Sequence, residues 1–179
     1  MRRRKITVEE LLSQYERGER NFSGVDLNHG NLFEAQLKGV NLNGSFLHHA
    51  NLAYANLEGA NLDQAHFLGA NLSRVMLEKA HLRQAQLQNA KLIGAILRDC
   101  QLSDANLMGA NLHVSVLERA DLSRADLRGA TLTSAVMTDA QLNGTLLSRC
   151  NLLHTQGVNL RGAIYDLNTT FPDGFSRPE

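Results

Sequence analysis

A leucine, replaced in a few places by Phe or Met, recurs at every fifth residue from Phe22 to Leu152. A small residue, most often alanine, usually stands two positions earlier, and Asn, Asp or Gln often lies between them, as in Ala105-Asn106-Leu107. An α-helix turns about 100° per residue, so steps of five would scatter these leucines around its axis. In a flat strand, an odd step would put successive leucines on opposite faces. Neither straight element can therefore bury this pattern.

A coil that turns once per repeat can bury it. Within one repeat the small residue and the leucine are two positions apart, so an extended backbone points both side chains in the same direction. The chain must then turn, so that the next pair points toward the same axis. Four right-angle turns close a square coil of about twenty residues, and stacked coils would hydrogen-bond as strands do, about 4.8 Å apart. The pattern predicts an all-β solenoid of about seven coils with leucine in its centre.

The repeat is similar to that of the pentapeptide-repeat family, which reads Ala-(Asp/Asn)-Leu-x-x. The resemblance extends from Phe22 to Tyr165. Further copies are Ala110-Asn111-Leu112, Ala120-Asp121-Leu122 and Ala125-Asp126-Leu127. This resemblance implies a right-handed quadrilateral β-helix, and the handedness rests on it alone. Members of the family are plentiful in cyanobacteria.

Residues 1–20 lack the repeat and are predicted to form an N-terminal capping helix. Thr7 and Glu10 have the spacing of a capping box, in which each side chain bonds the backbone N–H of the other residue. Gly18 suits the C-terminal end of the helix. The ends of repeat proteins need covering, because an exposed end coil invites association. We therefore expect the apolar face of this helix to cover the open end of the leucine column.

The repeats are expected to form a β-helix over residues 21–167, followed by a closing segment and tail over residues 168–179. Leu152 and Leu160 are eight positions apart instead of five, which predicts a small bulge between them. In the closing segment, a turn flanked by two aromatic residues resembles the end of many family members. The rings expected to cover the last coil are those of Phe171 and Phe175.

The composition limits the functions that the chain can have. Its 18 basic and 18 acidic residues give a formal net charge of zero, so no global field attracts nucleic acid. No apolar run is long enough to span a membrane. The basic residues 2–5 are followed by a polar, helical sequence, which argues against a signal peptide. We therefore expect a cytoplasmic protein that binds neither nucleic acid nor a membrane.

The two cysteines, Cys100 and Cys150, both occupy the small inward-facing position of the repeat. They are fifty residues apart, which places them on opposite walls and about 12 Å apart along the axis. A disulfide needs Cα atoms within about 7 Å. We expect two buried, reduced thiols that act as small apolar side chains.

Residues n and n+20 should be vertical neighbours, and each wall is named after its first core residue: Phe22, Leu27, Leu32 or Leu37. The Leu27 wall carries a histidine cluster in its first three coils, whose members are His29, His48, His49 and His66. Facing imidazoles could bind a transition metal. No cysteine joins them, however, and solvated surface histidines are the simpler interpretation. Metal binding remains an alternative, and no cofactor is expected.

The Leu37 wall is unusual, because the position that commonly holds Asn or Asp is apolar in four successive coils. This apolar column consists of Met76, Ile96, Val116 and Val136. Ile93 and Val114 on the adjoining Leu32 wall extend it. Two columns of charged residues run beside it, and in the second of them the signs alternate. A contiguous exposed apolar stripe can mark an interface, although β-branched residues also stabilise a stacked sheet. We predict that these six residues form an interaction surface for a protein partner or for self-association.

A leucine-filled coil has no cleft for convergent catalytic groups, so we do not expect an enzyme or a small-molecule substrate. The leading hypothesis is a non-catalytic protein-interaction or regulatory module. The resemblance also implies a second hypothesis, since quinolone-resistance members of the family imitate duplex DNA and bind gyrase. That function calls for a strongly acidic surface, and the zero net charge argues against it.

Overall fold

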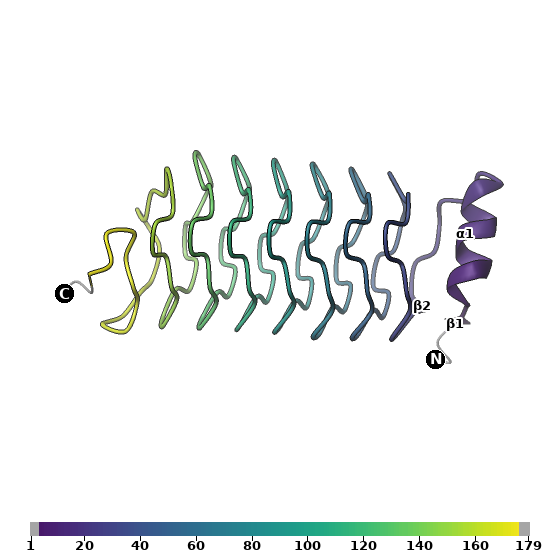
Figure 1. The fold of residues 1–179 in the computed structure, drawn as a ribbon, viewed down its shortest axis with the longest axis horizontal. Coiled ribbons are helices and arrows are strands. Elements are labelled where there is room, and N and C mark those ends of the chain that lie inside the picture. The colour runs from purple at the N-terminus through teal and green to yellow at the C-terminus, as the bar shows by residue number, and fades with distance from the viewer. Residues whose placement is uncertain (1–3, 176–179) are drawn as a thin grey trace.

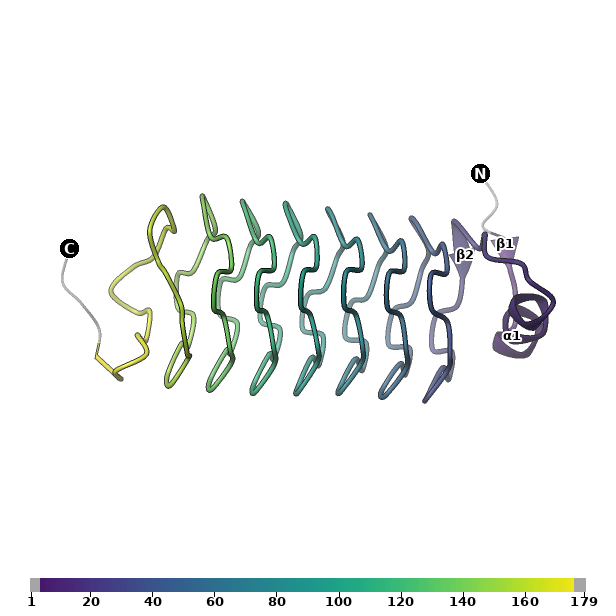
Figure 2. The same ribbon diagram turned by 90° about the horizontal axis from the view of Figure 1, so that it is seen from above.

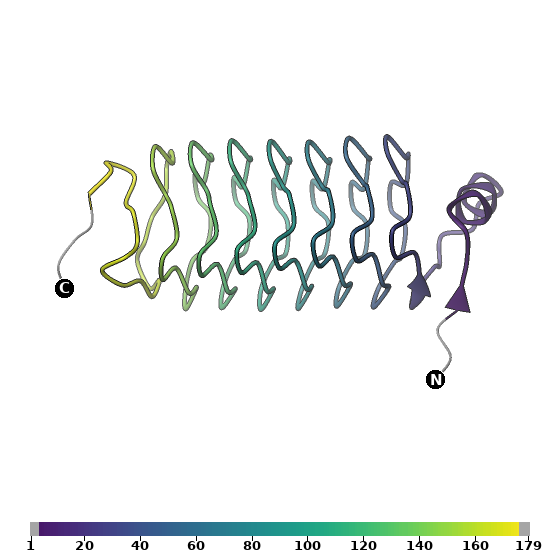
Figure 3. The same cartoon turned by 60° about the horizontal axis from the view of Figure 1, so that its bottom comes forward.

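The computed structural model describes residues 4–175, which form a stack of similar coils with one helix at its N-terminal end (Figure 1). Strand β1 (Arg4–Lys5), helix α1 (Val8–Glu16) and strand β2 (Val25–Asp26) come first. Parallel bridges then join the residue before each core residue to the residue twenty positions later, from Asn21↔Asn41 to Val136↔Gln156. The coils stay in register when the molecule is viewed from above or from below (Figures 2 and 3). The predicted β-solenoid and its twenty-residue period are confirmed.

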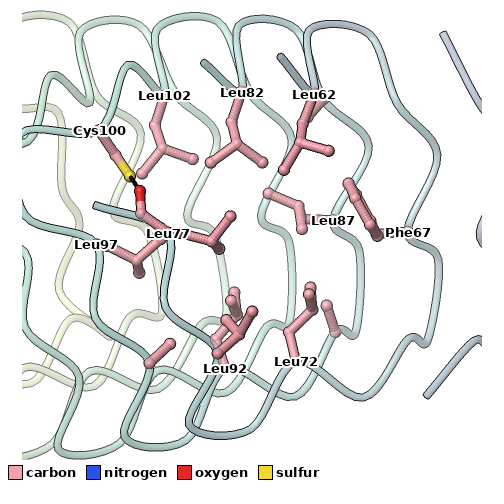
Figure 4. Packing of buried hydrophobic residues seen from close by; sticks show 14 of the residues in the cluster. Leu62, Phe67, Leu72, Leu77, Leu82, Leu87, Leu92, Leu97, Cys100 and Leu102 are labelled. Carbon is pink, nitrogen blue, oxygen red and sulfur yellow. Dashed lines mark hydrogen bonds between the residues drawn. The ribbon is translucent and has the colours of Figure 1, made fainter. Parts of the chain in front are cut away.

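The fifth-residue positions form the core. Every one of them from Phe22 to Leu152 is at most 3% exposed. In the middle of the stack, side chains such as Leu72, Leu92 and Leu97 point into one common interior (Figure 4). This arrangement buries leucine from all four walls against leucine from the coils above and below.

Polar groups at the small inward-facing position can donate to a backbone carbonyl of the coil below. The hydroxyl of Ser45 donates to the carbonyl of Phe22 in the coil below at 2.9 Å. The thiol of Cys100 makes the same kind of bond, to the carbonyl of Leu77 at 2.7 Å (Figure 4). Because each buried donor has an acceptor, these substitutions of the usual alanine leave no buried polar group unsatisfied.

The Asn or Asp before each leucine closes the corner that follows it. The Oδ1 atom of Asn106 accepts a hydrogen bond from the backbone N–H of Met108 at 3.1 Å, and Asp121 does the same for Ser123 at 3.0 Å. The next residue turns the chain with a positive φ, as at Gly109, where φ is +64°. The commonest residues of the repeat are therefore those that stabilise its turn.

Helix α1 has the predicted capping box. The hydroxyl of Thr7 accepts a bond from the N–H of Glu10 at 3.1 Å, and the Glu10 carboxylate accepts one from the N–H of Thr7 at 2.9 Å. Gly18 ends the helix with φ at +96°, and its N–H donates to the carbonyl of Tyr15 at 3.0 Å. The helix is therefore closed at both ends by local hydrogen bonds.

Helix α1 lies against the first coil, with Leu11 fully buried and with Val8 and Leu12 packed against the core. The hydroxyl of Tyr15 donates to the carbonyl of Lys38 at 2.8 Å. Strand β1, which the sequence analysis did not predict, pairs in parallel with β2 and so continues the ladder below the first coil. Within the described residues, no helix is long and apolar enough to cross a membrane.

The last coil is shorter than the others. Gln156 pairs with Val136 at a spacing of 20 residues, but Ile164 pairs with Leu146 at a spacing of 18. The predicted bulge is wrong, because the chain takes a path two residues shorter instead of inserting residues. The prediction for the closing rings is half right. Phe171 is 3% exposed and covers the last coil, whereas Phe175 is 71% exposed.

Candidate interaction surface

The four residues of the apolar column lie in one parallel ladder. Bridges join Met76 to Ile96, Ile96 to Val116, and Val116 to Val136. All four side chains are half-buried, because each contacts its neighbours in the ladder while its outer face meets solvent. The column is therefore continuous, and it contributes both to sheet packing and to the outer surface.

The corner between the Leu32 and Leu37 walls extends this apolar surface. Ile93 is half-buried, and Val114 is 44% exposed. The same corner carries Phe33 and Tyr54, which are 46% and 47% exposed and pack edge to face with ring centroids 5.7 Å apart. The guanidinium of Arg74 lies 5.9 Å from the centre of the Tyr54 ring. The sequence analysis missed this aromatic pair, although the twenty-residue register places both residues at one corner.

The apolar column lacks a hydrogen bond that stabilises other corners. On the same wall, Asn56 Oδ1 accepts a bond from the N–H of Glu58 at 3.1 Å. An apolar side chain cannot accept such a bond. The equivalent N–H groups belong to the residues two positions after each member of the column, namely Glu78, Arg98, Glu118 and Thr138. Within residues 4–175, none of these four N–H groups has a hydrogen-bond partner. Four successive coils therefore do without this local stabilisation of the turn.

Charged side chains flank the column and pair between coils, as their alternation predicts. Arg98 lies between Glu78, at 3.7 Å, and Glu118. Arg119 donates two hydrogen bonds to Asp99, at 2.7 and 2.8 Å, and these bonds lower the pKa of the Asp99 carboxyl. These side chains are all partly exposed to solvent, so each pair contributes little to stability. Their arrangement instead gives the column a polar rim of both signs.

Three rings of the histidine cluster stack on a neighbouring ring, whereas His48 lies 5.7 Å from His66 and is tilted from it by 56°. The rings of His29 and His49 are 5.4 Å apart and 18° from parallel, and His66 stacks on Phe46 at 4.7 Å and 9°. The nitrogen lone pairs of the nearly parallel His29 and His49 rings point in similar directions, so this pair does not converge on one metal ion. Between Arg4 and Phe175, no group of three or more His, Cys, Asp or Glu residues is placed to hold a metal.

One concavity on the surface contains acidic and basic residues. The concavity between α1 and the first coil, of about 530 Å³, contains Lys5, Glu10, Asp26 and His29. Its two carboxylates are already engaged, Glu10 in the capping box and Asp26 in accepting the N–H of Asn28 at 3.2 Å. The two carboxylates of this concavity therefore serve local structure.

The two cysteines are buried and free, as predicted. Burial raises the pKa of the Cys100 thiol to about 12, and it raises that of Cys150 to about 12 as well. A thiol with so high a pKa supplies almost no thiolate near neutral pH. Neither cysteine is therefore placed to act as a nucleophile.

Comparison with solved structures gives similar pentapeptide-repeat folds, among them HetL and QnrB1. HetL, a pentapeptide repeat protein involved in heterocyst differentiation regulation from the cyanobacterium Nostoc sp. strain PCC 7120, is 28% identical with a TM-score of 0.61. The match covers 96% of this chain and 100% of HetL. Trypsin-treated QnrB1, a plasmid-mediated fluoroquinolone resistance protein, is 20% identical with a TM-score of 0.54. That match covers 83% of this chain and 86% of QnrB1, and it shows the fold alone.

A search of curated protein sequences gives no match. Two family profiles match the repeats themselves. The profile of pentapeptide repeats, in 8 copies, matches residues 21–53, 30–67 and 50–86, and that of the pentapeptide repeat region matches residues 80–156. Together with the buried leucine at every fifth position, these matches show that the chain belongs to the pentapeptide-repeat family.

Proposed function

We propose that this protein is a non-catalytic interaction module that binds another protein chain through the apolar column and its corner residues Ile93 and Val114. Pentapeptide-repeat proteins are in general non-enzymatic structural or interaction modules. HetL, whose length this chain spans fully, is involved in the regulation of heterocyst differentiation. A regulatory role through protein binding is therefore the function we infer for this chain.

The observation that carries the proposal is the missing Asn or Asp in four successive coils. Each replacement removes an acceptor for a turn N–H and leaves apolar surface in water. Neither effect favours the isolated folded chain, whereas covering apolar surface stabilises a complex by roughly 25 cal/mol per Å² before association costs. The paired charges beside the column would form the polar rim that such contacts commonly have.

The test restores the common repeat residue at the centre of the column, as Ile96→Asn with Val116→Asn. The matched control makes the same change on another wall, as Lys91→Asn with Thr131→Asn. Proteins captured from a native lysate would be compared between the two variants and the unchanged chain. We expect the first variant to lose capture while the control keeps it, with both variants melting close to the unchanged protein. Equal capture by both variants would contradict the proposal.

Imitation of DNA has less support from the walls. The Glu and Asp residues beside the apolar column are interspersed with Arg and Lys, so they do not form an acidic wall. QnrB1 is similar in fold at 20% identity, which carries no function to this chain. A gyrase supercoiling assay decides the matter, and we expect neither inhibition nor protection when the protein is in excess.

A further inference from the structure

One column beside the apolar column is only half satisfied by its own chain. Its charged residues are Lys79, Asp99, Arg119 and Asp139, in ascending coils. Arg119 bonds Asp99 through two nitrogens. In the part of the chain that the structure describes, Lys79 and Asp139 form no ion pair. They are three coils apart, about 14 Å, so they cannot pair with each other within one chain.

A two-fold axis can bring two such walls face to face. We consider an axis that lies in the plane between the walls, at right angles to the stack, and passes midway between the coils of Ile96 and Val116. It reverses the direction of the second stack. Ile96 then lies opposite Val116 of the second copy, and Met76 lies opposite its Val136. This is the placement that uses all four members of the apolar column, and packed sheets of this kind lie about 10 Å apart.

The same axis matches the charges. Lys79 comes opposite Asp139 of the second copy, so the two unpaired ends of the column meet across the axis. Asp99 comes opposite Arg119, so each arginine lies between a carboxylate of its own chain and one of the second copy. The adjacent column, which contains Arg98 and Glu118, also brings opposite charges together, because Arg98 comes opposite Glu118 of the second copy.

Moving the axis by half a coil reverses this agreement. If it passes through the coil of Ile96, Asp99 meets Asp99 of the second copy, Arg98 meets Arg98, and Lys79 meets Arg119. An axis through the coil of Val116 likewise sets Arg119 against Arg119. Like charges face each other in both cases, which is how charge patterns exclude a wrong register. The alternating charges therefore select one antiparallel register.

We propose that the Leu37 wall is the contact of an antiparallel, two-fold symmetric dimer of this chain, centred between Ile96 and Val116. This inference rests on the proposed function and names its partner as a second copy. The corner agrees, because Val114, which protrudes, comes opposite Gly94. A column about 14 Å tall covers less than the ~800 Å² per partner of a standard interface. The dimer is therefore weak, and the fraction of the chain in it rises with protein concentration.

The experiment uses the pair that meets only across the axis. Sedimentation of the full chain over a range of concentrations gives the dimer constant. Lys79→Asp alone places two carboxylates together twice per dimer, and Asp139→Lys alone places two ammonium groups together twice. We expect each to weaken the dimer by tenfold or more, in a manner that salt reduces. Both side chains are exposed, so folding should change little. A thermal melt of each single variant checks this, because Lys79 lies near Asp99 and Asp139 near Arg119 in the same chain.

Recovery distinguishes this register from a general effect of charge. The double variant Lys79→Asp with Asp139→Lys should dimerise as the unchanged chain does. An equimolar mixture of the two single variants should also recover, as a heterodimer. Lys91→Asp, on the Leu32 wall, is the matched control and should leave the dimer constant unchanged.

The outcomes separate this inference from the proposed function. A chain that stays monomeric at all concentrations, while its capture of another protein depends on Ile96 and Val116, overturns the dimer and leaves the proposed function standing. A dimer that neither reversal weakens, or one whose mixture fails to recover, overturns the antiparallel register. A dimer that behaves as expected, together with Ile96→Asn and Val116→Asn abolishing it, supports both.

Discussion

At the scale of single residues, one position decides how each corner of the coil is stabilised. Where it holds Asn or Asp, a side-chain oxygen bonds the N–H two residues later, as Asn106 does for Met108. Where it holds Ile96 or Val116, that bond is absent, and the side chain packs instead against its vertical neighbours. The residue at this position therefore either stabilises the turn or adds apolar surface to the outside of the coil.

Val114 carries strain that a substitution should relieve. Its φ is +51°, in the left-handed region that a β-branched residue rarely adopts. Such a conformation costs of order 1–3 kcal/mol. Since Asn tolerates it, we expect Val114→Asn to raise the free energy of unfolding by about 1 kcal/mol. Urea unfolding measures the change.

Ser134→Asn, one coil above, is the control for this change. Ser134 has φ at +58° without β-branching, so its replacement should gain less. Equal stability of Val114→Asn and the unchanged protein would show that the neighbouring coils relieve the strain.

The buried thiols should make stability depend on alkaline pH. Burial raises the pKa of Cys100 from 9.0 to about 12, so the folded chain holds this proton more tightly than the unfolded chain. The contribution is fully present below about pH 9 and is lost as the pH rises toward about 12. We expect Cys100→Ala with Cys150→Ala to lose less stability between about pH 8 and pH 10.5 than the unchanged protein. Parallel loss in both proteins, measured by denaturant unfolding, would refute this.

At the scale of elements, the two ends of the stack are covered differently. Helix α1 and strand β1 cover the N-terminal end, where Leu11 is fully buried. The C-terminal end closes with a shortened coil and the ring of Phe171, while Leu167 is 61% exposed. The coils themselves bury their own leucines, so what the end elements contribute is cover for backbone edges and apolar surface.

Deleting residues 1–20 should therefore cause association more than unfolding. The deletion removes strand β1, which pairs with β2, and so uncovers the first coil around Leu27. We expect the shortened chain to keep its β-sheet circular dichroism and to associate end to end, which light scattering would detect. Lys79→Asp in the shortened chain is the control, since it weakens wall contacts without affecting the end. A shortened chain as monodisperse as the full one would mean that α1 does not protect this end.

The sequence predicts the elements where a pattern specifies them. The period of five gives the coil, and Thr7 with Glu10 gives the start of the helix. Strand β1 is two residues long with exposed side chains, so no alternation of apolar and polar residues marks it. The spacing of Leu152 and Leu160 predicts a bulge instead of the shortened coil, because leucine spacing reports chain length and not the path of the backbone.

At the scale of the whole molecule, the twenty-residue register determines which residues lie next to one another on the outer surface. The register predicts that Met76, Ile96, Val116 and Val136 lie in one column, and the bridges of the structure agree. It could equally have placed Phe33 and Tyr54 at one corner, but their ring contact depends on side-chain rotamers. The sequence likewise does not say which charges pair, because Arg98 has acidic neighbours both above and below it.

A stack in which each coil contacts only its neighbours should be most sensitive at its middle. Leu107 is fully buried there, with coils on both sides. We expect Leu107→Ala to reduce the free energy of unfolding by about 2–5 kcal/mol, because it leaves a cavity that the rigid coils cannot fill. Leu107→Asp should prevent folding, since it buries a charge without a partner. Met108→Asp is the control, because the adjacent side chain is 38% exposed and points outward. Thermal melts followed by circular dichroism compare the three variants, and a Leu107→Asp melt matching that of Met108→Asp would show that the centre of the stack tolerates charge.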